Sequence, residues 1–278
     1  MAITSFNELL EVGAHFGHMR SKWNPAMAPY IFAEKNGIHI IDLNKTVVKI
    51  EESANALKQI ARSGKKILFV ATKKQAKEIV AEKVKAIGMP YVTERWPGGM
   101  LTNFATIRKT VRRMAQIDKM TKDGTFENIS KKERLNISRE RAKLENLFGS
   151  IADLTRLPSA IFIVDVSKEN IAVAEAKKLN IPSFGIVDTN SNPNCVDFAI
   201  PANDDASTSI AYIMDIICKS VAEGLSERKQ DKDAQEADEK DEVIEKEGAT
   251  KFSSAKDNEE KSPAKKGARK RTTTPARK

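Results

Sequence analysis

Short apolar runs alternate with helical patterns along most of this chain, and this alternation constrains the fold more than any other feature. Runs short enough to be buried strands lie at 37–41, 67–71, 160–164 and 184–187, with weaker candidates at 91–93 and 198–200. Apolar residues recur with helical spacing in 45–62, 74–87, 170–179 and 205–222. Alternating strands and helices build a parallel sheet with helices on both faces. We therefore predict an α/β fold of three layers, in which helices cover both faces of a parallel sheet.

Residues 104–148 break the alternation. Asp123-Gly124 favours a turn, and Ser130 with Glu133 has the spacing of a capping box. The apolar stripe before the turn comprises Phe104, Ile107, Val111, Met114, Ile117 and Met120, and a less regular stripe after it comprises Leu135, Ile137, Leu144, Leu147 and Phe148. Helices with one apolar stripe each bury little beyond their shared seam, so we predict an antiparallel, coiled-coil-like hairpin that projects from the α/β domain.

The charge is concentrated in this inserted segment. The chain carries a net charge of +9, and residues 105–148 hold twelve bases against six acids, whereas residues 149–226 hold five bases against ten acids. A surplus of bases favours a polyanionic partner, so we predict that the polar faces of the hairpin bind phosphate groups. A solvated helical face remains the alternative. The candidate RNA-binding residues chosen here by charge are Arg108, Lys109, Arg112, Arg113, Lys131, Lys132 and Arg134.

Residues 226–278 differ from the rest in composition. They are rich in charged and small residues, and Phe252 is their only aromatic side chain. Such a segment cannot bury enough apolar area to offset its backbone entropy, so we predict a disordered charged tail. Its last part, 261–278, holds eight bases and no acid. It could reach RNA electrostatically, or the tail could serve solubility alone.

The segment 15–25 interleaves histidines, bases and aromatic residues. Cations bind phosphates and flat side chains stack on unpaired bases, so Arg20, Lys22 and Trp23 are candidate RNA-binding residues. A loop packed on the sheet through Phe16 and Trp23 is an equal alternative, and both can hold at once.

An enzymatic function has little support in the sequence. Neither GxGxxG nor GxxxxGK[ST] follows the predicted strand 67–71, and no GxSxG or HExxH motif occurs in the chain. Gly98-Gly99 could form an anion-binding turn, with a plain tight turn as the simpler alternative. We predict no catalytic residue and no cofactor.

A metal site is the second alternative to RNA binding. Asp165, Asp188 and the pair Asp204-Asp205 follow or flank predicted strands, and His15 and His18 share one short segment. Carboxylates and histidines bind metals, but helix capping and loop fixing are commoner roles, so we predict no metal.

Compartment follows from cysteine use and from the N-terminus. Cys195 and Cys218 form no CxxC pair and are too few for a disulfide framework, which favours reducing cytoplasm. The first residues lack a basic run before an apolar stretch, and no segment approaches the roughly 18 apolar residues of a membrane span. We expect a cytoplasmic protein without a membrane partner.

Long motifs along the chain carry a resemblance to a known family. They are GAHFGHMRSKWNPAMAPYIF (13–32), NGIHIIDLNKT (36–46), ILFVATKKQA (67–76), ERWPGGMLTNFATI (94–107), IPSFGIVDTNSNP (181–193) and IPANDDA (200–206). In order and spacing, from Ser5 to Leu225, the chain resembles the universal S-two family, the second protein of the small ribosomal subunit. The helical insertion resembles its bacterial and organellar branch. Ala26, Pro97 and Ala202 depart from the family pattern at single positions.

This resemblance implies a fold and a function. The fold would be a doubly wound α/β domain, flavodoxin-like or Rossmann-like, with a protruding helical hairpin. The resemblance also implies a protein without enzymatic activity, seated on the ribosome between the head and body of the small subunit. Its partners would be small-subunit ribosomal RNA and neighbouring ribosomal proteins, including the large mRNA-binding first protein of that subunit. Besides the hairpin, it implies RNA contacts for Arg20, Lys22, Trp23, Lys73, Lys74, Arg95 and Trp96.

We expect three parts in the chain. Residues 1–103 and 149–225 form a discontinuous α/β domain, 104–148 the helical hairpin, and 226–278 the tail. A metal-dependent enzyme built on the aspartates, and a general module that binds DNA through the tail, remain alternatives.

Overall fold

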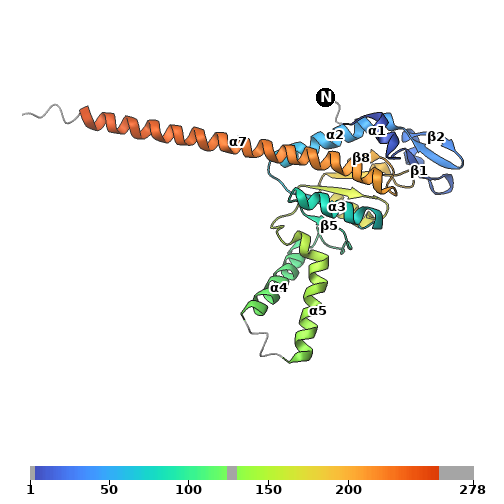
Figure 1. Cartoon of the computed structure of the whole chain (residues 1–278), viewed down its shortest axis with the longest axis horizontal. Helices are drawn as coiled ribbons and strands as arrows, with labels where there is room; N and C mark the ends of the chain where they lie inside the picture. Colours follow the sequence, from blue (N-terminus) through green and yellow to red (C-terminus); the bar gives the residue numbers. More distant parts are fainter. Residues whose placement is uncertain (1–3, 124–129, 257–278) are drawn as a thin grey trace, which may run out of the picture. The chain divides into compact units, whose positions relative to one another are not determined.

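The computed structural model describes residues 4–123 and 130–256, with residues 232–256 described by their backbone alone. The chain divides into two units between Arg228 and Lys229, and the first unit holds both sheets and the inserted helices (Figure 1). None of the helices in the described ranges is both long enough and apolar enough to cross a membrane.

Five parallel strands form the central sheet, in the order β5-β4-β6-β7-β8. They are β4 (Ile67–Val70), β5 (Tyr91–Val92), β6 (Ala160–Val164), β7 (Ser183–Val187) and β8 (Phe198–Pro201). Counted along the chain this is the order 2-1-3-4-5, the flavodoxin-like form of the doubly wound fold. The predicted fold class is confirmed, and all but one of the predicted strands lie in this sheet.

Two apolar layers bury the sheet from both sides. One layer draws on α1 (Phe6–Glu11), α2 (Leu43–Arg62), α3 (Lys74–Ala86) and α7 (Ser207–Lys256), and the other on α6 (Asn170–Lys178) and the roots of α4 (Phe104–Lys122) and α5 (Lys131–Phe148). The helix bounds agree with the predicted ones within a few residues, except at the end of α7. At the start of α2 the cap is Asp42, whose carboxylate accepts the N–H of Asn44 at 3.1 Å.

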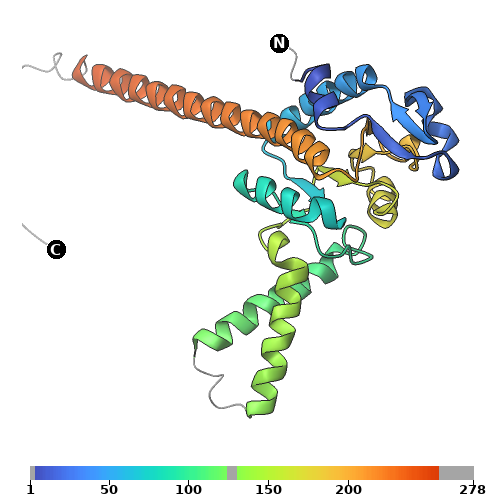
Figure 2. The same ribbon diagram turned by 45° about the vertical axis from the view of Figure 1, so that its right-hand side comes forward.

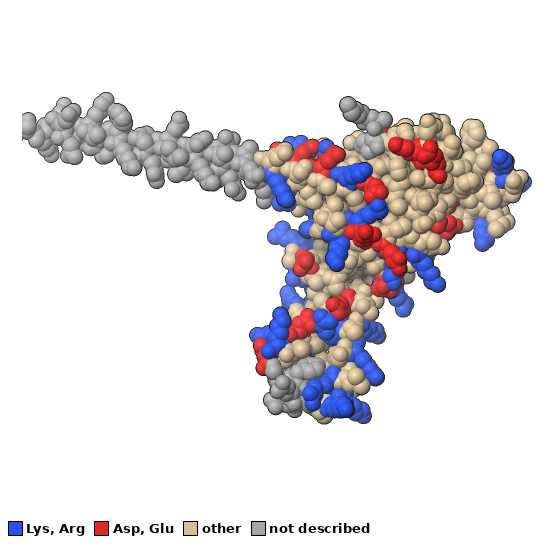
Figure 3. All heavy atoms as spheres, in the orientation of Figure 1, with Lys and Arg blue, Asp and Glu red and all other residues tan. Residues whose placement is uncertain are grey.

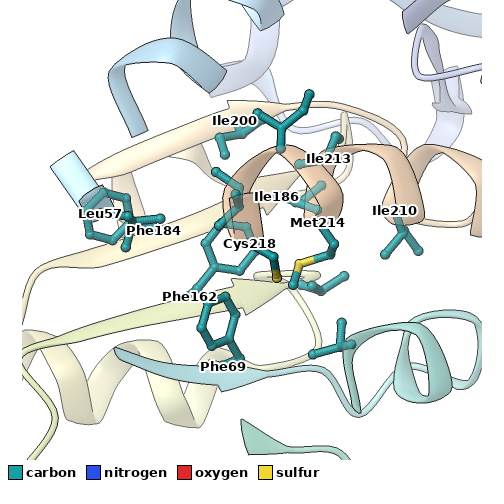
Figure 4. Packing of buried hydrophobic residues seen from close by; sticks show 14 of the residues in the cluster. Leu57, Phe69, Phe162, Phe184, Ile186, Ile200, Ile210, Ile213, Met214 and Cys218 are labelled. Carbon is teal, nitrogen blue, oxygen red and sulfur yellow. The ribbon is translucent and has the colours of Figure 1, made fainter. Parts of the chain in front are cut away.

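A row of phenylalanines crosses four strands on the face covered by α7. Phe69, Phe162, Phe184 and Phe198 occupy matching register positions on neighbouring strands. The ring centroids of Phe69 and Phe162 are 5.5 Å apart, and those of Phe184 and Phe198 are 4.5 Å apart and stacked. Figure 4 shows Phe69, Phe162 and Phe184 of this row beneath α7, and Phe198 is partly buried at its end. Fully burying each such side chain contributes about 2 kcal/mol, so the row is a large part of the core.

A second, antiparallel sheet corrects one prediction. The strand predicted at 37–41 is β3 (Ile38–Ile41), which pairs with β1 (Phe16–Met19) and β2 (Ile31–Lys35) in the order β1-β3-β2 and not with the parallel strands. Asn36 and Gly37 have φ values of 55° and 75°, as a two-residue hairpin between β2 and β3 requires. The Asn-Gly pair is the sequence signal for this hairpin. The residues of β2 are mostly exposed, so the strand has no apolar run from which it could be predicted.

The inserted residues form two helices with the predicted bounds, α4 and α5. The Ser130 hydroxyl caps α5 by accepting the N–H of Glu133 at 3.4 Å. Ile117 is buried, whereas Leu135 near the start of α5 is 51% exposed. Figures 1 and 2 show the helices close together near the parallel sheet and apart at their other ends. The helical pair is therefore present, and its coiled-coil packing stays a prediction.

The end of α7 differs from the prediction. We predicted a helix ending at residue 222 and disorder from residue 226, but the backbone stays helical to Lys256. The basic segment 261–278 lies outside the described residues, which end at residue 256. The division into three parts stays a prediction.

A buried carboxylate fixes the turn that carries Gly98-Gly99. Glu175, on α6, accepts hydrogen bonds from the N–H groups of Gly99 (2.7 Å), Leu101 (2.9 Å) and Thr102 (3.1 Å), from the Thr102 hydroxyl (3.2 Å) and from Trp96 Nε1 (3.2 Å). Burial opposes its charge, but the donated hydrogen bonds outweigh burial and lower the pKa of Glu175. The turn thus binds an anion, and the anion belongs to the chain itself.

Replacing this carboxylate tests its structural role. We expect Glu175→Gln to lower the free energy of unfolding by about 2 kcal/mol at pH 7, because an amide cannot accept all the donors. A lowered pKa gives stability that is present above the ordinary pKa of glutamate and lost as pH falls through the folded-state value. Urea unfolding at pH 7, 5 and 4 should therefore show a shrinking difference from the wild type. A difference that does not change with pH would contradict this account.

Candidate nucleic-acid interface

Helices α4 and α5 carry half of the candidate RNA-binding residues. Figure 3 shows Lys and Arg side chains gathered over this pair of helices. Lys109, Arg112, Lys131, Lys132 and Arg134 are exposed, and none forms an ion pair with a carboxylate among the described residues. These side chains can bind phosphates without first giving up an acidic partner.

Other bases of the hairpin are held by the protein. The half-buried Arg108 donates to the carbonyl oxygen of Thr155, which ties the root of α4 to the chain that follows α5. Arg113 Nε lies 3.6 Å from a carboxylate oxygen of Glu140, between exposed side chains. Arg108 is therefore a structural residue, whereas an exposed pair such as Arg113 with Glu140 contributes little and can open to a phosphate.

The basic turn near the N-terminus is exposed. The 3-10 turn η1 (Arg20–Lys22) follows β1, and the Arg20 side chain is 70% exposed, with Nη1 3.4 Å from Glu34. Lys22 is exposed as well. The ring of Trp23 is 37% exposed and packs at 5.3 Å from the ring of His39. One side of Trp23 is thus in contact with the protein, while part of the ring stays accessible.

Contacts with Thr189 hold this turn on the edge of the parallel sheet. The His18 N–H donates to the Thr189 hydroxyl at 2.8 Å, and the Asn24 N–H donates to the Thr189 carbonyl oxygen at 2.7 Å. A Cβ on Gly17 would lie 2.6 Å from Thr189 Cγ2, so only glycine fits there. Sequence reasoning did not find Thr189, because 171 residues separate it from His18.

In two pairs of adjacent candidate residues, one side chain is exposed and the other is largely buried. Lys74, at the start of α3, and Arg95 are exposed. Trp96 is only 6% exposed and donates to Glu175, so its ring cannot stack on RNA. Lys73 is 13% exposed, with Nζ 2.7 Å from oxygens of both Asp204 and Asp205. The polar groups of Trp96 and Lys73 are therefore occupied within the protein, whereas those of Lys74 and Arg95 are accessible.

Lys73 lies in a cluster of acids at the carboxyl ends of the parallel strands. Asp165 Oδ2 is 3.4 Å from its ammonium group, in addition to Asp204 and Asp205. Burial alone would lower the pKa of Lys73, but its hydrogen bonds to Asp204 and Asp205 outweigh burial and raise that pKa above its ordinary value. The lysine is thus a fixed cation within the protein.

His18 reaches the same cluster from β1. Its Nδ1 is 3.0 Å from Asp188 Oδ2, and its Nε2 is 3.3 Å from Asp205 Oδ2. The hydrogen bond to Asp188 raises the pKa of His18. Burial and the charges of Asp188 and Asp165 raise the pKa of Asp204. The structure therefore brings together His18 and all four candidate aspartates, but not His15, whose pKa is lowered by burial.

Fold and surface together define a class of protein: a doubly wound α/β domain without a nucleotide-binding loop, with a cationic helical hairpin inserted between β5 and β6. A family model described as ribosomal protein S2 matches residues 9–224, and the chain belongs to that family.

Curated relatives agree with this assignment. The small ribosomal subunit protein uS2 of Bacteroides thetaiotaomicron is 68% identical over 237 residues, which cover 85% of each chain. The proteins of the same name from Parabacteroides distasonis and Porphyromonas gingivalis are 65% and 64% identical, over 86% and 84% of this chain and 86% and 83% of their own lengths. The family is structural and not enzymatic, so this chain is a ribosomal protein that serves translation and is not an enzyme.

A comparison of adjacent lysines tests the structural assignment of Lys73. We expect Lys73→Met to lower the free energy of unfolding by about 3 kcal/mol, because the buried Asp204 loses its cation. Lys74→Met, at the exposed neighbour, should change it by less than about 0.5 kcal/mol. Urea unfolding at pH 7 measures both. Equal effects would mean that the carboxylates do not depend on Lys73.

Proposed function

We propose that this protein is a structural component of the small ribosomal subunit that binds its ribosomal RNA through the cations of α4 and α5 and through the turn at Arg20–Lys22. The relatives' names place those proteins in the small subunit. The observation that carries the proposal is the set of exposed hairpin cations without a described acidic partner. Such side chains release counterions from RNA when they bind phosphates, which favours association.

The proposed RNA-binding set is narrower than the one predicted from sequence. It comprises Arg20, Lys22, Trp23, Lys74, Arg95, Lys109, Arg112, Arg113, Lys131, Lys132 and Arg134, which are exposed. Lys73, Trp96 and Arg108 are left out because the protein occupies their polar groups.

The position of the protein on the small subunit and its protein partners are part of the same proposal. The family resemblance implies a position between the head and body of the small subunit and a contribution to docking the large mRNA-binding first protein. Five of the ten acids in residues 149–226 are buried, so the acid surplus of this segment provides little surface for a basic protein neighbour, and this part of the proposal rests on the family resemblance.

Reversing three charges on α5 tests the RNA contact. We expect the triple variant Lys131→Glu, Lys132→Glu and Arg134→Glu to bind small-subunit ribosomal RNA at least about 100-fold more weakly at 100 mM salt, because three phosphate contacts become repulsive. If about six phosphates are neutralised, log K for the wild type should fall by roughly 4 to 6 units per tenfold rise in salt, and the variant should lose about 2 to 3 units of that slope. Filter binding over a salt series measures both.

The control variant makes the same number of charge reversals at lysines outside α4 and α5. Lys65→Glu, Lys177→Glu and Lys178→Glu alter three exposed lysines outside the hairpin. This variant should bind RNA close to wild type, whereas equal losses in both variants would reduce the effect to net charge.

Sedimentation tests the ribosomal role itself. Tagged protein in a cell lysate at moderate salt should migrate with small subunits on a sucrose gradient. Recovery only at the top of the gradient, with the subunits intact, would contradict the proposed function.

A further inference from the structure

The acid cluster lies along the carboxyl ends of the parallel strands, the side of the sheet on which doubly wound folds bind ligands, and it extends from β4 and β6 to β7 and β8. In the strand order found here, the crevice opens at the carboxyl ends of β4 and β6, where the order reverses. Lys73 follows β4, Asp165 follows β6, Asp188 follows β7 and Asp204 follows β8. His18 enters this edge from β1 of the other sheet. Neither the RNA contacts nor the packing of the core makes use of this group.

Three of these side chains have the arrangement of a metal site. One ligand atom each from His18, Asp188 and Asp204 lies within 4.8 Å of the other two. His18 Nδ1 and Asp188 Oδ2 are 3.0 Å apart. Ligand atoms that share one cation at about 2.0 to 2.2 Å lie about 3 to 3.5 Å from each other, so small side-chain adjustments would close the site.

Buried oxygens without donors point to a missing positive partner. The side chain of Asp204 is fully buried, and while its Oδ1 accepts from Lys73, its Oδ2 has no hydrogen-bond donor. Asp188 is 1% exposed, its Oδ1 accepts from Thr189, and among the described residues its buried Oδ2 faces only the Nδ1 of His18, at 3.0 Å. A desolvated carboxylate oxygen left without a donor is costly, so such atoms usually face a cation.

The charges of the cluster do not balance either. Four aspartates, Asp165, Asp188, Asp204 and Asp205, surround a single lysine, Lys73. With all four carboxylates ionised, even a protonated His18 leaves two negative charges in excess. A divalent cation would remove that excess.

We propose that His18, Asp188 and Asp204 bind one divalent transition-metal cation, Zn²⁺ above all. An imidazole nitrogen with two carboxylates is a ligand set that suits Zn²⁺, whereas Mg²⁺ takes oxygen ligands in octahedral geometry and retains several waters. The ion joins β1 to the ends of β7 and β8. It thereby fixes the turn that carries Arg20 and Lys22 against the parallel sheet.

Metal binding to the full-length protein tests this inference without reference to RNA. After dialysis against a chelator and reloading with Zn²⁺, gel filtration and elemental analysis should find one zinc per chain, and Zn²⁺ should raise Tm. His18→Ala and Asp188→Asn should each weaken zinc binding by at least about 100-fold. His15→Ala is the matched control, since it removes a neighbouring histidine outside the trio, and should keep its zinc. Mg²⁺ alone should not raise the Tm of the wild type.

The outcomes are distinct from those of the proposed function. No zinc on the wild type, or equal zinc on His18→Ala, overturns the site and leaves His18 and Asp188 as an ion pair only. If the variants do not fold, X-ray absorption at the zinc edge of the loaded wild type identifies the ligand atoms and tests the site. A shell of nitrogen and oxygen that includes one imidazole supports the site, and a sulfur ligand from Cys195 or Cys218 overturns it. Because the assay contains no RNA, a failed metal site leaves the ribosomal role standing, and the reverse is also true.

Discussion

A parallel sheet has to be covered on both faces, because its crossover connections put helices there and its strands are apolar on both sides. In this chain α2, α3 and α7 contribute one cover, while α6 and the roots of α4 and α5 contribute the other. With both faces closed, polar chemistry is left to the carboxyl ends of the strands and to whatever is inserted between them. Carboxylates lie at the carboxyl ends of the strands, and exposed cations lie on the inserted helices α4 and α5. The apolar core separates these two groups of charges.

Local patterns in the sequence were enough to predict most of the fold. The apolar runs gave every parallel strand, and the helical spacing gave α4 and α5 with their bounds, because a strand or helix depends mostly on neighbours a few residues away. The antiparallel sheet escaped, since the residues of β2 are mostly exposed and carry no burial pattern. The Asn36-Gly37 turn could have revealed it. Composition alone does not predict the helical backbone of α7 beyond residue 226, because Ala, Glu and Lys have high helix propensity even in a segment that is poor in apolar residues.

Individual site residues were harder to predict than the surface they belong to. Lys74 and Arg95 are exposed as an RNA contact requires, but their sequence neighbours Lys73 and Trp96 face inward. The partners that decide this lie far away in sequence: Asp204 is 131 positions from Lys73, and Glu175 is 79 positions from Trp96. Spacing within a motif carries no information on such partners. Charge counting could find a cationic surface, and only tertiary contacts could show which cations are free.

The turn around Gly98-Gly99 has a consequence for how the protein behaves among small metabolites. Its N–H groups already hold Glu175, a tethered group whose effective concentration is in the millimolar range or above. A free nucleotide would have to displace that internal competitor before its phosphate could bind there. Changes in the cellular concentration of ATP or GTP should therefore not alter what is bound at this turn.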